Sequence, residues 1–319
     1  MSKLAAVPAE PSLERLGNPL LRYFLATRPA FLTITLVGVL LGFAITWHAG
    51  VPFDAEAALM SLLLAVLAHA GVNVLNDYYD HLNGTDAVNG DRLFPYTGGS
   101  RFIQNGVLTP RQTLAFGLAL FLAVILGGLW LIGHSGSGLF WIGLAGLSIG
   151  WAYSAPPLQL NSRGLGEVCV GAGFLLVVVG ADFVQRGGFA IAPWLVGLPY
   201  ALMVTNILYI NQFPDRSADL AAGKRHWVAR LTPERAAHGY GLILLLAMGW
   251  LVGITAAHRL PLWSLLALLA ALPALQAARD LRRFAALPPL LAPAIRATIA
   301  AAHGLAVLLA LSLVLDKLA

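Results

Sequence analysis

The chain has 319 residues, of which 58% are hydrophobic and only 11% are charged, and its mean hydropathy is +0.76. A soluble domain carries about 25% charged residues, so this composition excludes a soluble globular protein. The formal net charge of +5 needs no nucleic acid to explain it, because basic residues at a membrane serve topology, anionic lipid or a phosphorylated substrate.

The first 28 residues differ from the rest of the chain. Glu10 and Glu14 stand among basic residues, which excludes the basic opening and short apolar core of a secretory signal. We therefore expect a cytoplasmic segment over residues 1–28 and one transmembrane domain over residues 29–319. Within the segment, Leu13–Leu25 is either an amphipathic helix on the membrane surface or a solvated tail.

Apolar runs of about 20 residues, the length that crosses a bilayer, follow one another from Phe31 to Leu315. We predict an all-α polytopic membrane protein of about nine transmembrane helices. Their approximate bounds are residues 30–49, 56–76, 111–133, 137–154, 165–184, 191–211, 236–256, 260–278 and 295–315. A single cysteine, Cys169, excludes an intramolecular disulfide and a cysteine-based metal cluster.

Basic residues collect on one side of this predicted bundle. Of the Lys and Arg residues, all but Arg186, Arg259 and Lys317 fall on the side of the N-terminus. By the positive-inside rule that side is cytoplasmic, so we expect the N-terminus inside and the C-terminus outside a bacterial cytoplasmic membrane. Two long connections, roughly Asp80–Pro110 and Asn211–Arg235, lie on the same side, and long loops tend to carry function.

A first cluster of amide and carboxylate side chains ends the second predicted helix. The chain there reads Asn73-Val74-Leu75-Asn76-Asp77-Tyr78-Tyr79-Asp80-His81-Leu82-Asn83-Gly84-Thr85-Asp86. If the helix continues to Asp80, Asn73 and Asp77 share one face at i,i+4 spacing. Asn76 and Asp80 share a face in the same way, so oxygen ligands converge there. We expect Gly84 to end the helix and Asp86 to fold back towards the cluster.

A second cluster ends the sixth predicted helix, where Asn211, Asp215 and Asp219 follow one another at intervals of four residues. We expect them to line one face of the helix, with a kink at Pro214. A lone Asp at a helix end is as readily a solvated cap as a ligand. Two clusters on one side of the membrane repel each other unless cations are present, and magnesium prefers such oxygen ligands. The scattered histidines, such as His69, offer no zinc spacing.

Basic residues follow both clusters. Lys224 follows the second and Arg101 the first, so these side chains could share the charge of a diphosphate leaving group with a metal ion. Each is equally well explained as a topology determinant. The apolar helices beside such a charged site would shelter a long isoprenoid tail.

The chain resembles the UbiA superfamily of intramembrane aromatic prenyltransferases over nearly its whole length. The matching motifs are Arg28-Pro29, Asn76-Asp77-Tyr78-Tyr79-Asp80 with Gly84-Thr85-Asp86, Tyr153-Ser154-Ala155-Pro156-Pro157, Asn211-xxx-Asp215-xxx-Asp219 and Ala221-Ala222-Gly223-Lys224-Arg225. Gly84-x-Asp86 departs from the 4-hydroxybenzoate enzymes and resembles the 1,4-dihydroxy-2-naphthoate branch of menaquinone biosynthesis. Arg163-Gly164-Leu165-Gly166-Glu167 and Asn211-Gln212-Phe213-Pro214-Asp215 point the same way.

The resemblance implies a bundle of nine transmembrane helices around a central cavity, with cytoplasmic loops that cap two magnesium ions. It implies transfer of a polyprenyl group from an allylic polyprenyl diphosphate to an aromatic acceptor, with membrane lipid around the bundle and no obligate protein partner. Asn76, Asp80 and Asp86 would bind one ion. Asp215 and Asp219 would bind the other, supported by Asn211. Asp77 would be a further ligand or would orient the acceptor.

Further residues follow from the same hypothesis. Lys224 and Arg101 would hold the departing diphosphate, and Tyr153, with Tyr78 or Tyr79, would stabilise the allylic cation. Tyr153 is equally well explained as an interfacial anchor. Arg163 would pair with the acceptor carboxylate or would serve topology only. The remaining candidate substrate-binding residues are Asn73, Asn211 and Ser154.

Other functions remain open at this point. A transporter would place its acidic residues near the middle of the membrane, whereas these cluster at one surface. A CDP-alcohol phosphotransferase would carry a single long Asp-Gly-xx-Ala-Arg motif, which is absent from the sequence. Within prenyl transfer, 4-hydroxybenzoate, homogentisate and a glycerol phosphate are alternative acceptors. A non-catalytic scaffold would need neither acidic cluster.

Overall fold

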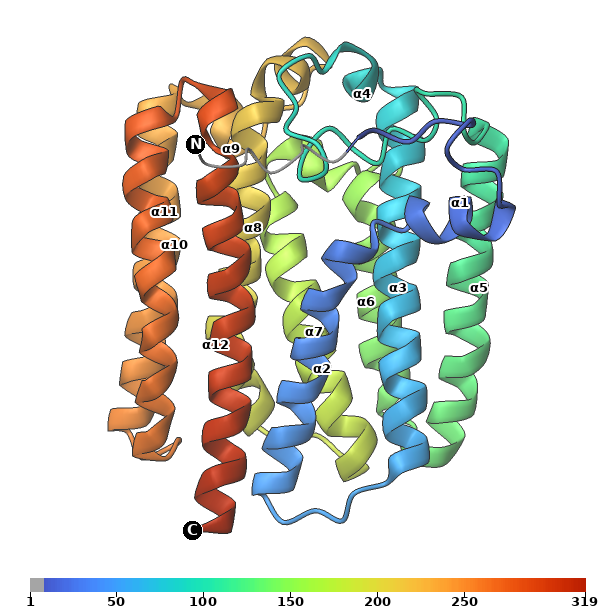
Figure 1. The fold of residues 1–319 in the computed structure, drawn as a ribbon. Coiled ribbons are helices and arrows are strands. Elements are labelled where there is room, and N and C mark those ends of the chain that lie inside the picture. The colour runs from blue at the N-terminus through green and yellow to red at the C-terminus, as the bar shows by residue number, and fades with distance from the viewer. Residues whose placement is uncertain (1–8) are drawn as a thin grey trace.

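The computed structural model describes residues 9–319, and the elements found over these residues are all helical (Figure 1). The long elements are α2 (Pro29–His48), α3 (Ala55–Leu82), α5 (Pro110–Ser135), α6 (Leu139–Ser154), α7 (Gly166–Arg186), α8 (Ala192–Ala221), α10 (Pro233–Ala256), η2 (Leu262–Ala270) continuing into α11 (Ala271–Phe284), and α12 (Ala292–Leu318). The short elements are α1 (Pro19–Ala26), α4 (Thr85–Val88), η1 (Leu160–Arg163), α9 (Trp227–Arg230) and η3 (Pro288–Leu290).

The predicted all-α membrane fold is confirmed. Eight helical stretches within residues 9–319 are long and apolar enough to cross a bilayer, and the 16-residue α6 completes the predicted series. Large apolar side chains such as Leu59 and Leu245 are exposed on the outside of the bundle, as expected for contact with lipid. The protein is therefore an integral membrane protein.

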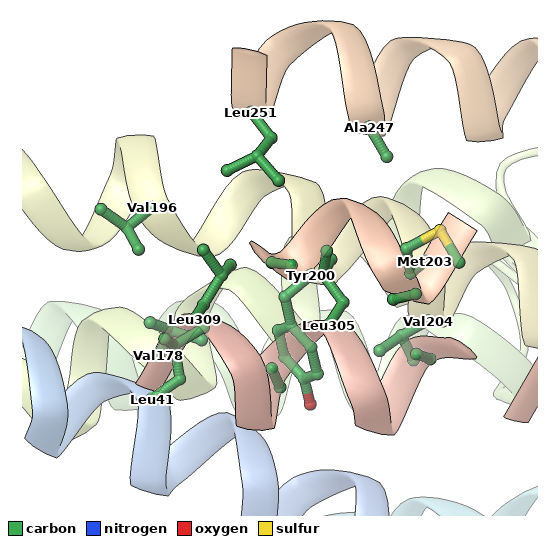
Figure 2. Close-up of a cluster of buried hydrophobic side chains, with 14 of the residues drawn as sticks. Leu41, Val178, Val196, Tyr200, Met203, Val204, Ala247, Leu251, Leu305 and Leu309 are labelled. Atoms are coloured by element: carbon green, nitrogen blue, oxygen red, sulfur yellow. The ribbon is translucent and has the colours of Figure 1, made fainter. Parts of the chain in front are cut away.

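A large buried hydrophobic cluster lies between helices of the bundle. In the largest buried cluster, Leu41 of α2, Val178 of α7, Tyr200 of α8 and Leu305 of α12 meet (Figure 2). The hydroxyl of Tyr200 donates a hydrogen bond to the carbonyl oxygen of Ile34 at 2.6 Å. A Cβ atom at Gly38 would lie 2.6 Å from that hydroxyl, so glycine permits the close approach. This cluster holds α2, α7, α8 and α12 together.

Both acidic clusters lie on helices that extend past the apolar spans. α3 continues past residue 76 to Leu82, with Gly84 just after its end as expected, and α8 continues past residue 211 to Ala221. α8 also runs as one α-helix through Pro199 and Pro214, so Pro214 does not end it. Both clusters thus lie on the last turns of long helices. Hydropathy ended these helices early because their last turns carry polar side chains for an internal site.

The segment before α2 includes a helix. α1 presents Leu20 and Phe24 on its exposed side, which favours the amphipathic helix over the solvated tail. Leu16 and Ala26 pack against Phe102 of the connection between α3 and α5. The part of the segment before residue 9, including Lys3, lies outside the described residues.

Candidate active site

A cavity of about 690 Å³ lies between α2, α3, α5, α6, α7 and α8. On α3 its lining extends from Ser61 to Asp80, which is about 28 Å along the helix axis. Its walls are apolar over most of this length, with residues such as Leu64 and Leu131. Its polar end lies beneath α4, at the end of the bundle opposite the C-terminus (Figure 1). The cavity therefore joins a charged site to a long apolar space.

The polar end holds the five side chains that we predicted as the main ligands of the two metal ions. They come from three elements, and they are Asn76 and Asp80 of α3, Asp86 of α4, and Asp215 and Asp219 of α8. Asp80 is 8% exposed and Asp86 3% exposed, so their charges are largely removed from water. Burial, and then the carboxylates of Asp80 and Asp77, raise the pKa of Asp86 well above its ordinary value. Such a site needs positive charge.

Lys224 supplies part of this charge. Its Nζ atom lies 2.9 Å from Oδ1 of Asp80 and 3.2 Å from Oδ1 of Asp219, so one ammonium group joins the two clusters. Burial alone would lower the pKa of Lys224, but these two carboxylates outweigh burial and raise it. Lys224 is therefore charged throughout the physiological pH range. His226 lies on the other side of Asp219, with Nε2 at 3.0 Å from Oδ2.

The connection between α3 and α5 covers the acidic end, and we call residues 89–109 the capping segment. Its backbone N–H at Gly98 donates to Asp215 at 3.2 Å, and the side chain of Asn89 donates to the same carboxylate at 2.6 Å. Gly99 has φ +71, and a Cβ atom there would lie 2.6 Å from Oδ2 of Asp86. Only glycine fits between the capping segment and the carboxylates at this position.

The donors of this site suit a hard divalent cation, because they are all carboxylate or amide oxygens. Within residues 9–319, no three His, Cys, Asp or Glu side chains already converge on one point as a formed metal site. Instead, Lys224 lies between Asp80 and Asp219, and the Asn89 amide donates to Asp215. These groups therefore occupy carboxylates that would hold a metal ion.

Several predicted substrate-binding residues lie beside the acidic end. Tyr153, Asn73 and Asn211 line the cavity. The amide of Asn73 donates to the carbonyl oxygen of Thr27 at 3.0 Å, which fixes its orientation. Ser154 lies just behind the lining, where its hydroxyl accepts a hydrogen bond of 2.9 Å from Asn76. Ser154 thus orients a predicted ligand.

Besides Ser154, four predicted residues do not line the cavity. Asp77 is buried and accepts the backbone N–H of Ser100, so it anchors the capping segment. Arg101 donates to the backbone carbonyl of Asp86. Tyr78 packs edge to face against Tyr79. Arg163 is exposed and donates to the carbonyl of Pro157, so the structure does not bring it to the place where an acceptor carboxylate would bind.

Arg28 was missed as a candidate by sequence reasoning, although its Arg-Pro motif was noted. Its guanidinium lines the cavity, donates to the carbonyl oxygen of Tyr96 at 3.2 Å, and has its Nε atom buried without a partner in the described chain. No carboxylate among residues 9–319 lies within 4.0 Å of it. A cation at an apolar cavity without an acidic partner suits an anionic ligand.

Known proteins resemble this chain over most of its length. Residues 35–290 match the UbiA prenyltransferase family. A 1,4-dihydroxy-2-naphthoate octaprenyltransferase of Escherichia coli is 30% identical over 251 residues, which cover 76% of this chain and 79% of that protein. A protein of the same name from Bacillus subtilis is 27% identical over 232 residues, covering 72% of this chain and 71% of that one.

The fold is also that of a solved membrane protein. The structure of a UbiA homologue from Archaeoglobus fulgidus, bound to DMAPP and Mg²⁺, superimposes with a TM-score of 0.55 at 16% identity. The similarity covers 90% of this chain and 99% of that one. The sequence match over most of the chain, together with the shared fold, confirms the resemblance read from the motifs. The chain belongs to the UbiA prenyltransferase family and is a membrane prenyltransferase.

Proposed function

We propose that this prenyltransferase moves a polyprenyl group from an allylic polyprenyl diphosphate to 1,4-dihydroxy-2-naphthoate, in a magnesium-dependent reaction. One observation carries the proposal. Lys224 joins the two acidic clusters, and the end of the cavity where they lie opens directly into an apolar space, the whole lining being about 28 Å long. A diphosphate needs cations at its head, whereas a polyprenyl tail needs apolar walls. The cavity offers both in the order in which the substrate carries them.

The acidic donor set is the place for magnesium. Asn76, Asp80 and Asp86 would hold one ion, and Asp215 and Asp219 a second, a set that lines the same end of the cavity. When bound, the metal supplies positive charge that neutralises the diphosphate as it leaves. The relative from Archaeoglobus fulgidus, bound to Mg²⁺ and DMAPP, supports this use of a divalent metal.

Side chains of this chain then take up the remaining tasks. Lys224 contributes an ammonium that the diphosphate oxygens can contact in place of Asp80 and Asp219. Tyr153 lines the cavity with an electron-rich ring that stabilises positive charge on the allylic carbon. The apolar walls exclude water, which would otherwise capture that carbon. As the bond from the allylic carbon to the diphosphate oxygen breaks, the acceptor ring forms the new carbon–carbon bond, and loss of carbon dioxide restores its aromaticity.

Arg28 takes the role that the sequence suggested for Arg163. It lines the cavity near Asp77 but forms no ion pair within 4.0 Å among residues 9–319, so it would pair with the carboxylate of the acceptor and orient the ring. The naphthoate acceptor is favoured over 4-hydroxybenzoate by Gly84-x-Asp86 and by the names of the two bacterial relatives. We place the acidic end at the cytoplasmic face, because most basic residues lie at that end.

The acceptor is tested by supplying the purified protein with a radiolabelled polyprenyl diphosphate, magnesium, and either 1,4-dihydroxy-2-naphthoate or 4-hydroxybenzoate. We expect a prenylated lipid from the naphthoate that a chelator abolishes. Product from 4-hydroxybenzoate alone would overturn the acceptor while leaving the chemistry intact. No product from either acceptor with folded protein would overturn the proposal as a whole.

A further inference from the structure

Two buried side chains at the wall of the cavity form a pair that the proposed roles leave unused. Gln212 of α8 lines the cavity and is 7% exposed, and Glu167 in the first turn of α7 is 9% exposed. The amide nitrogen of Gln212 donates a hydrogen bond of 3.1 Å to Oε1 of Glu167. The pair therefore ties α7 to α8 beside the polar end of the cavity.

The chemistry of the pair fixes the orientation of the amide. A carboxylate oxygen of Glu167 accepts this hydrogen bond, so the pair presents the NH₂ group of Gln212 to Glu167 rather than its carbonyl oxygen. The carbonyl oxygen then faces another direction, and it is buried without a donor in the part of the chain that the structure describes. Buried acceptors nearly always have a partner, so this one calls for a donor from outside the chain.

The depth of Gln212 indicates which substrate group could be that donor. Gln212 and Asp215 line the cavity from the same face of α8, and Gln212 lies three residues earlier, about 4.5 Å further into the membrane. The diphosphate belongs at the level of Asp215, so Gln212 lies near the level of the reacting carbon. Tyr153 of α6 lines this region as well.

Of the groups that the proposed reaction brings here, only one offers a proton to an amide oxygen. The diphosphate oxygens accept hydrogen bonds, and a polyprenyl chain has no polar hydrogen. The aromatic acceptor carries hydroxyl groups, which donate. Its carboxylate would be held by Arg28 and Asn73, which line the same cavity from the start of α2 and from α3.

We propose that the carbonyl oxygen of Gln212 accepts a hydrogen bond from a hydroxyl group of the aromatic acceptor, and that Glu167 positions Gln212 to do so. The inference rests on the proposed prenyl transfer to a hydroxylated aromatic acid. The ring is then held at two points, its carboxylate at Arg28 and its hydroxyl at Gln212. Two fixed points determine which ring carbon faces the allylic carbon.

The test compares Gln212→Met with the wild type. Methionine keeps the length of the side chain but removes the oxygen that accepts the hydrogen bond. Gln185→Met is the matched control, because Gln185 is a buried glutamine that is hydrogen-bonded to the backbone of Asp54 at the other end of the bundle. We expect Gln212→Met to raise KM for the acceptor about tenfold, the effect of one lost hydrogen bond. KM for the prenyl diphosphate and the magnesium requirement should stay within about twofold.

Methyl ethers of the acceptor sharpen the test. In the wild type, methylating the hydroxyl that binds Gln212 should weaken competitive inhibition about as much as Gln212→Met weakens acceptor binding. In Gln212→Met the same methylation should have no further effect. If methylation and substitution had independent effects, the inference would be overturned. It would also be overturned if the KM for the acceptor and the KM for the prenyl diphosphate rose equally, because Gln212 would then contact the diphosphate or bound water.

Glu167→Gln tests the positioning role. Glutamine at this position can present either a donor or an acceptor, so the amide of Gln212 is no longer forced into one orientation. We expect a smaller rise in acceptor KM than for Gln212→Met, and no further rise when both substitutions are combined. A wild type that binds the diphosphate but prenylates no hydroxylated acid would contradict the proposed function. A wild type that does prenylate it, with Gln212→Met unchanged, would contradict only this inference.

Discussion

The ammonium group of Lys224 lies 2.9 Å from Oδ1 of Asp80, so a residue just beyond the end of α8 is bound to the last turn of α3. The contact brings together residues far apart in the sequence at the polar end of the cavity. It also places a fixed positive charge where a diphosphate would be held. Lys224 thus couples the two acidic clusters before any substrate binds.

Replacing Lys224 with methionine should therefore impair the enzyme at its charged end. We expect kcat/KM for the prenyl diphosphate to fall about a hundredfold, because a fixed cation at the leaving group is lost. Lys317→Met is the matched control, since Lys317 is exposed near the C-terminus, where it donates to the carbonyl of His48. Equal activity of the two variants in a steady-state assay would contradict the role of Lys224.

Substitutions of Arg28 and Arg163 should differ in their effect on KM for the acceptor. Arg28→Met should raise KM for the acceptor at least about tenfold, because it removes a half-buried cation that we propose to pair with the acceptor carboxylate. Arg163→Met should leave KM within about twofold, since Arg163 is exposed and bound to the carbonyl of Pro157. The reverse order, measured at saturating prenyl diphosphate, would restore the role that the sequence suggested for Arg163.

The length of prenyl chain that the enzyme accepts should depend on Gly146 of α6. Gly146 lines the cavity, and a Cβ atom there would meet no atom within 4 Å, so a phenylalanine could enter the apolar space. Gly146→Phe should raise KM for long polyprenyl diphosphates at least about tenfold while dimethylallyl diphosphate is used as before. Gly133→Phe is the control, because Gly133 on α5 is equally free of neighbours but exposed outside the cavity.

An acid-dependent contribution to stability lies at the opposite end of the bundle. Hydrogen bonds from His134 and from the N–H of Ala57 lower the pKa of Asp54. Because the pKa is lower in the folded protein, the stabilisation is complete above the unfolded pKa, near 4, and is lost as pH falls through the lowered value. Asp54→Asn keeps a helix-capping side chain but removes the charge, so it isolates the contribution of the ionised carboxylate to stability.

We expect Asp54→Asn to lower Tm at pH 6, with the gap to the wild type closing as pH falls below about 4. Prenyl transfer at neutral pH should change little, because Asp54 does not line the cavity. The measurement is thermal unfolding in detergent over a range of pH. A difference in Tm that stayed constant or widened on acidification would contradict the stabilising role of the Asp54 carboxylate.

The sequence predicted the helical bundle, and the residues that it proposed as metal ligands line one cavity, because both depend on local patterns. Apolar runs mark the membrane helices. Asp80 and Asp215 belong to clusters whose i,i+4 spacing places the ligands of each helix on one face, and they line one cavity. Hydropathy alone ends the apolar spans before α3 and α8 end, because polar side chains that face an internal site resemble a loop in a hydropathy profile.

The remaining parts of the site depend on contacts that no local pattern specifies. Arg28 has a left-handed backbone conformation (φ 59) immediately before Pro29, and that conformation helps to set the direction of its side chain. Gly98 and Gly99 reach the carboxylates only because the capping segment folds back over α3 and α8. Whether a basic residue binds substrate or serves topology is therefore decided by the fold and not by its distance from a motif.

The central claim is that the two acidic clusters joined by Lys224 form the site of prenyl transfer. Comparing the turnover of Asp80→Asn with that of Asp316→Asn tests this claim most directly. Asp80 contacts Lys224 at the polar end of the cavity, whereas Asp316 is paired with His48 near the C-terminus. At saturating magnesium we predict that Asp80→Asn lowers kcat at least about a hundredfold and that Asp316→Asn retains wild-type turnover. Near-full turnover by folded Asp80→Asn would contradict the account.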